Sequence, residues 1–68
     1  MTKRSEVHWR VSEFESGQPF IVMEQYAGDE LDLFKKFIGF DLPDGTSLDE
    51  AKQIRDLLSR KLIRVSET

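Results

Sequence analysis

Hydrophobic and polar residues alternate along the first part of the chain. Every second residue from Val7 to Val11 is apolar, which is the period-two pattern of a half-buried strand. Residues 20–26 are again rich in aromatic and branched side chains, and the intervening residues 15–18 include a glycine, as a tight turn requires. The pattern predicts a β-hairpin, preceded by a polar, mobile tail over residues 1–6.

The register of this hairpin decides which side chains share a face. A two-residue turn at 16–17 would set Val11 opposite Val22 and collect most apolar residues of the hairpin on one face. The opposite face would still hold several apolar side chains, and contiguous exposed apolar surface on a small protein usually marks an interface. We therefore expect a partner to contact three residues of that face: Phe14, Ile21 and Met23. A different register would instead place them in the core.

Two later segments show the helical period. Between Asp29 and Ile38 the apolar residues recur on one broad side, acidic residues occupy the first turn, and Gly39 follows as a C-terminal cap. Ser47 and Glu50 have the spacing of a capping box, in which each residue satisfies backbone N–H groups at the start of a helix. The pattern predicts one helix over 29–38 and a second that begins after Ser47.

A short branched run over residues 62–65 predicts a third strand after the second helix. The expected fold class is α+β, in the order ββααβ. The N-terminal hairpin and the short C-terminal strand would form a small antiparallel sheet, with two helices packed on one face. The domain is expected to span residues 7–66.

Length and cysteine content restrict how this domain can be stabilised. With 68 residues the chain is near the lower limit for a core that is stable alone, and it has no cysteine for a disulfide or a thiolate zinc site. Association with another protein or with a second copy, as a homodimer, is therefore an expectation. We expect a cytoplasmic protein without membrane contact, because no apolar run approaches the roughly 20 residues that span a bilayer and residues 1–6 lack a signal-peptide apolar region.

Charge argues against a polyanionic partner without excluding one. The net charge is −3, from 10 basic and 13 acidic residues, which disfavours nonspecific attachment to nucleic acid. The second predicted helix nevertheless carries several basic residues, so nucleic-acid binding is the alternative function. The residues that would bind nucleic acid are Lys52, Arg55, Arg60 and Lys61.

The residue types needed for catalysis do not occur in a recognisable arrangement. His8 is the only histidine, and no pattern places a nucleophile or carboxylate beside it. Acidic residues surround Gly45, but their spacing does not fit a calcium-binding loop, and no glycine-rich phosphate-binding motif is present. The sequence predicts no catalytic residue, metal site or cofactor. It indicates a non-enzymatic protein–protein interaction domain or an accessory or regulatory domain.

Overall fold

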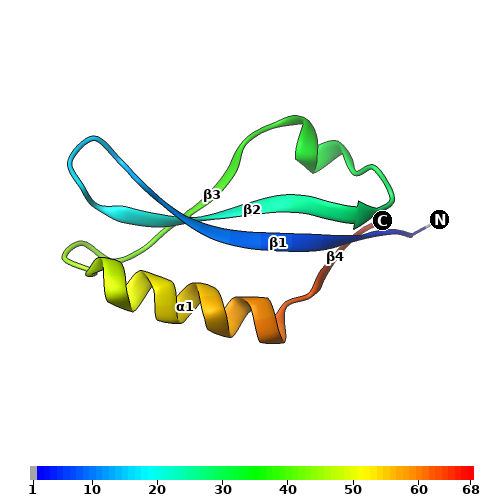
Figure 1. Cartoon of the computed structure of the whole chain (residues 1–68). Helices are drawn as coiled ribbons and strands as arrows, with labels where there is room; N and C mark the ends of the chain where they lie inside the picture. Colours follow the sequence, from blue (N-terminus) through cyan, green and yellow to red (C-terminus); the bar gives the residue numbers. More distant parts are fainter. Residues whose placement is uncertain (1) are drawn as a thin grey trace.

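The computed structural model describes residues 2–68 and contains four strands and one α-helix in this range. The elements are β1 (Lys3–Glu13), β2 (Pro19–Gly28), the single-turn 3₁₀ helix η1 (Asp32–Lys35), β3 (Ile38–Asp41), α1 (Leu48–Lys61) and β4 (Arg64–Glu67). The strands form one antiparallel sheet in the order β3-β2-β1-β4, with α1 on one side of it (Figure 1). The predicted order ββααβ with two helices is therefore wrong.

Four of the five predicted elements are confirmed. Strands β1 and β2 pair as a hairpin, and β4 is the strand expected near the C-terminal end. Helix α1 begins with the predicted capping box: the Ser47 hydroxyl accepts a hydrogen bond from the Glu50 backbone N–H at 3.1 Å, and the Glu50 carboxylate accepts one from the Ser47 N–H at 3.1 Å. Local sequence therefore determines where α1 starts.

The segment predicted as the first helix forms η1 and β3 instead. Asp29, the expected N-cap, is held by β1: its carboxylate accepts a hydrogen bond from the Arg4 N–H at 2.8 Å, and its own N–H donates to the Arg4 carbonyl at 3.0 Å. Leu31 takes the position before η1 and makes no side-chain cap. Residues 38–41 then pair with β2. These contacts with distant residues outweigh the helical period, which in isolation is weak over such a short segment.

The hairpin register differs by one residue from the predicted one. The loop contains three residues, 15–17, because the Phe14 N–H donates to the Gln18 carbonyl at 3.0 Å and Gly17 adopts a left-handed φ of 90°. This is the turn-plus-bulge loop that commonly joins antiparallel strands. Val11 therefore lies opposite Ile21 rather than Val22, so the β2 residues that were expected on one face occupy the other.

Residues 3–6, which were assigned to the polar tail, belong to β1: all four pair with β4, and residues 5–6 also pair with β2. Ser5 is buried, and its hydroxyl donates to the Ala27 carbonyl at 3.1 Å. Strand pairing uses backbone groups, so a polar sequence does not prevent it. Met1 lies outside the described residues.

The core lies between the sheet and α1. Its buried members are Trp9, Ile21, Met23 and Ala51, and half-buried apolar side chains from the η1 segment, from β3 and from α1 pack around them. We call this the helix side of the sheet.

The opposite side, which we call the far side, holds the buried residues Phe20 and Val22. Phe14 stacks on Phe20 with ring centroids 4.3 Å apart, and Phe37 meets it edge-on at 6.0 Å. Gly39, predicted as a helix cap, lies in β3, and a Cβ added there would be 3.2 Å from the Phe20 ring. The missing side chain makes room for this aromatic cluster.

Candidate interaction surface

Helix α1 is fixed to the sheet at its C-terminal end. The Trp9 indole Nε1–H donates to the carbonyl of Leu62 at 2.8 Å, and the Val7 N–H donates to the carbonyl of Ile63 at 3.2 Å. Both acceptors follow the last turn of α1, where carbonyl groups lack partners within the helix. These bonds set the position of α1 along β1.

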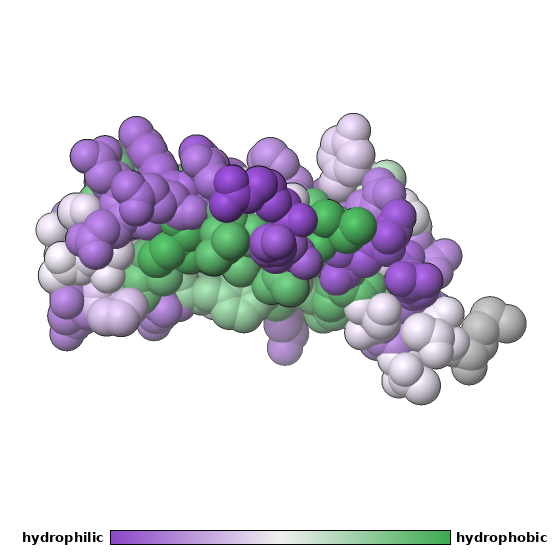
Figure 2. All heavy atoms as spheres, turned by 90° about the horizontal axis from the view of Figure 1, so that it is seen from below, coloured by the Kyte–Doolittle hydropathy of each residue, from purple (hydrophilic) through white to green (hydrophobic). Residues whose placement is uncertain are grey.

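One helix does not cover the helix side completely. The side chain of Phe40 points to this side because Phe40 pairs with Ile21, and its ring lies 5.8 Å from that of Trp9. Four large apolar residues keep 47–51% of their surface exposed; they are Phe40, Leu57, Leu62 and Ile63. We call these four residues the apolar band. Figure 2, which views the molecule from this side, shows a hydrophobic band running along it between hydrophilic borders.

One flank of α1 presents a regular row of side chains beside its buried stripe. At about 100° per residue, the row falls within a sector of roughly 60°, centred about 90° from the buried Ala51. Its members are Glu50, Ile54, Leu57 and Lys61. We call this row the α1 seam. Ile54 is half-buried against the core and Leu57 is 48% exposed, so the middle of the seam is apolar and its two ends carry opposite charges.

The predicted contact residues do not lie together on an exposed face. Ile21 is 1% exposed and Met23 is 8% exposed, and both belong to the core. The expected position of Ile21 and Met23 on an exposed face was wrong, because it depended on the two-residue turn. Phe14 is 46% exposed but stacks on Phe20 on the far side. The residues of the apolar band were missed as a surface. Only the one-helix architecture exposes them, and the sequence did not indicate it.

The basic residues proposed for nucleic-acid binding point in several directions around α1. Lys52 and Arg60 are exposed, whereas Arg55 is half-buried and pairs with the Asp56 carboxylate at 3.0 Å. At about 100° per residue, Lys61 projects on the opposite flank from Lys52. The four residues therefore form no single basic face.

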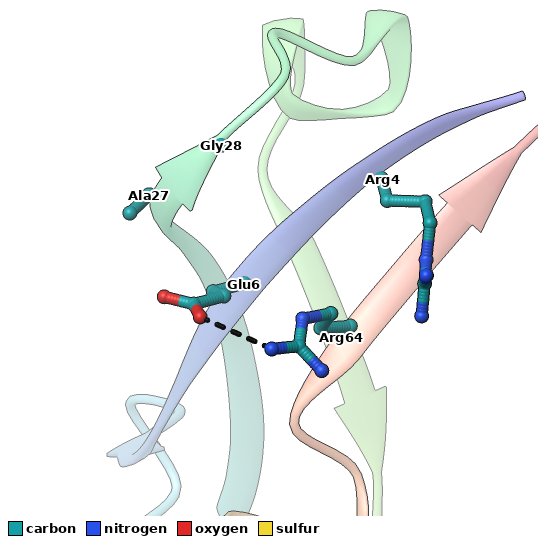
Figure 3. Close-up of a pocket in the computed structure, with 5 residues that line it drawn as sticks. All are labelled: Arg4, Glu6, Ala27, Gly28 and Arg64. Carbon is teal, nitrogen blue, oxygen red and sulfur yellow. Dashed lines mark ion pairs between the residues drawn. The ribbon is translucent and has the colours of Figure 1, made fainter.

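A shallow hollow of about 320 Å³ lies on the far side, near the ends of β1, β2 and β4. Figure 3 shows the Arg64 side chain directed at Glu6, with the Arg4 side chain apart from both. The Arg64–Glu6 ion pair spans 3.5 Å, and both side chains are nearly half exposed. Such a pair contributes little to stability. The hollow is open, and its lining residues, Arg4, Glu6, Ala27, Gly28 and Arg64, include neither a nucleophile nor a histidine.

Within residues 2–68, no group of three or more histidine or acidic side chains could hold a metal ion. The one α-helix in this range is neither long nor apolar enough to cross a bilayer. Comparison with protein-family models, with curated proteins and with solved structures gives no match to this chain.

Proposed function

We propose that this chain is a non-enzymatic protein–protein interaction module whose contact surface is the apolar band. The observation that supports this proposal is the contrast between four large apolar side chains left about half exposed on the helix side and a core with only seven buried hydrophobic residues. Exposed apolar patches of this kind on small proteins commonly mark interaction sites. A role in the cytoplasm belongs to the same proposal.

The experiment is an affinity capture with the full chain as bait, in lysate with and without nuclease. We expect capture of a partner protein to survive nuclease treatment and to be lost in Leu57→Glu. Leu48→Glu is the matched control, because Leu48 is also an exposed leucine of α1, 40% accessible, but lies on the opposite flank from Leu57. The control should capture the partner as the wild type does.

Two outcomes would contradict the proposal. Capture that is unaffected by Leu57→Glu and by Phe40→Ser would show that the apolar band is not the contact surface. Capture of nucleic acid that depends on Lys52 and Arg60 would instead favour the alternative function, with the steep salt dependence that counterion release imposes.

A further inference from the structure

We infer that the apolar band joins two copies of this chain, with α1 packed antiparallel against α1 of the second copy. This inference rests on the proposed function and names its partner. It depends on the spacing and charges of the α1 seam, and on how much surface the single chain leaves exposed.

The α1 seam has the spacing of a helix–helix contact. Its residues are separated by four, three and four positions, which is the repeat that brings one row of side chains against a neighbouring helix in a coiled coil. The two central residues, Ile54 and Leu57, are the branched aliphatic types that fill such contacts. Within α1 this row borders the stripe that packs on the sheet and centres on Ala51: Ile54 also packs against the core, and Leu57 is the exposed apolar member of the row.

The charges at the ends of the seam favour an antiparallel arrangement. A two-fold axis between residues 55 and 56 would place Ile54 opposite Leu57 of the second copy and Glu50 opposite Lys61 of the second copy. Each contact then occurs twice, as in an isologous interface. A parallel arrangement would instead oppose Glu50 with Glu50 and Lys61 with Lys61. No ion pair joins Lys61 to another residue within 2–68, so its ammonium group is available.

The single chain exposes more surface than a compact monomer of its size. Its accessible surface is 5028 Å², whereas about 4,400 Å² is typical of a folded monomer of 7.9 kDa. Its radius of gyration is 12.9 Å against about 11 Å for a compact domain, and it measures 41 × 23 × 16 Å. The excess of roughly 600 Å² approaches the approximately 800 Å² that each partner buries in a standard stable interface.

The first test is the mass in solution, measured by sedimentation over a concentration series. We expect the wild type to approach twice 7.9 kDa as concentration rises. Leu57→Glu should raise the dimer dissociation constant at least about tenfold, because it places two carboxylates in the apolar centre of the contact. Leu48→Glu should leave the constant unchanged. Circular dichroism of both variants checks that the fold is intact, as expected for residues that are 48% and 40% exposed.

The second test determines the orientation of the two helices. The chain has no cysteine, so Glu50→Cys and Lys61→Cys each introduce a single thiol. A disulfide requires Cα atoms within about 7 Å. Antiparallel packing predicts efficient oxidation only when the two variants are mixed, and little when either is oxidised alone. Parallel packing predicts the reverse.

The outcomes separate this inference from the proposed function. A chain that stays monomeric at every concentration, yet captures another protein through Leu57, would overturn the homodimer and leave the proposed function intact. A dimer that is insensitive to Leu57→Glu would overturn the α1 seam as the contact. Disulfides formed by each variant alone would overturn the antiparallel arrangement.

Discussion

The two sides of the sheet bury similar apolar residues, but they are covered in different ways. On the far side, Phe20 and Val22 are buried, and Phe14 beside the hairpin loop and Phe37 from the β2–β3 connection lie against Phe20. The Arg10–Glu24 ion pair also lies on that side. On the helix side, a single helix covers the centre of the core and leaves the apolar band exposed.

The far side shields Phe20 with two aromatic rings that stay partly exposed themselves, whereas the helix side leaves the four residues of the apolar band about half exposed around a single helix. A few aromatic side chains are enough to shield two strand residues, so few residues of the chain are needed for this. A four-stranded sheet needs more cover than one 14-residue helix provides. Substitutions on either side of the sheet should therefore differ in their effect on stability.

Ile21→Asp should unfold the domain, at a cost of more than about 4 kcal/mol, because it buries an unpaired carboxylate at the centre of the helix side. Chemical denaturation followed by circular dichroism measures this effect. The control is Tyr26→Asp in the same strand, where the side chain is 75% exposed and the fold should persist. A folded Ile21→Asp would mean that the core does not lie on the helix side.

Trp9→Phe should destabilise the domain by about 1–3 kcal/mol. Phenylalanine keeps an aromatic ring in the core but leaves the Leu62 carbonyl without the indole N–H that bonds to it at 2.8 Å. Hydrogen exchange should accelerate most in the last turn of α1. Uniform acceleration along α1 would show that this bond does not hold the end of the helix.

Phe14→Ala should cost about 1 kcal/mol, since it removes the ring stacked on Phe20. Phe37→Ala should cost a similar amount or less, because Phe37 is already 67% exposed. Both variants should bind more of an apolar fluorescent dye, as they convert the far side into a second exposed apolar surface. Unchanged dye binding would indicate that other side chains shield Phe20.

The smallest effect concerns the capping box of α1. The Ser47 backbone N–H, and next the Ser47 hydroxyl, hold the pKa of Glu50 below its usual value of 4.5. A carboxyl group whose pKa is lowered by folding adds stability above its unfolded pKa, and this contribution disappears as the pH falls through the folded pKa. We expect a small loss of melting temperature below pH 4.5 that is absent in Glu50→Gln. An NMR titration of Glu50 with a midpoint at or above 4.5 would contradict this.

Elements with strong local determinants could be predicted from the sequence. The alternation around Trp9 and the Ser47–Glu50 capping box depend on near neighbours in the chain, and both gave correct elements. The structure of the segment after Asp29 could not be predicted in this way. The Asp29 carboxylate accepts a hydrogen bond from the backbone N–H of Arg4, 25 positions earlier. Local periodicity carries no information about such a contact.

The candidate surface was not predictable for a related reason. A hairpin loop one residue longer than expected exchanged the two faces of β2, so Ile21 moved from the expected surface into the core. The first predicted helix does not form, so it does not cover Phe40 and Leu57, which stay exposed. Each error concerned only a few residues. Together they explain why the apolar band differs from the predicted contact surface.

The pairing of β1 with β4 has a consequence for how the domain forms during synthesis. Lys3 lies opposite Glu67, so β1 can complete its pairing only after β4 has left the ribosome. Contacts between such distant positions raise the contact order and slow folding. Trp9 must also wait for the carbonyl of Leu62. The β1–β2 hairpin can form early, but the sheet is complete only once β4 has emerged.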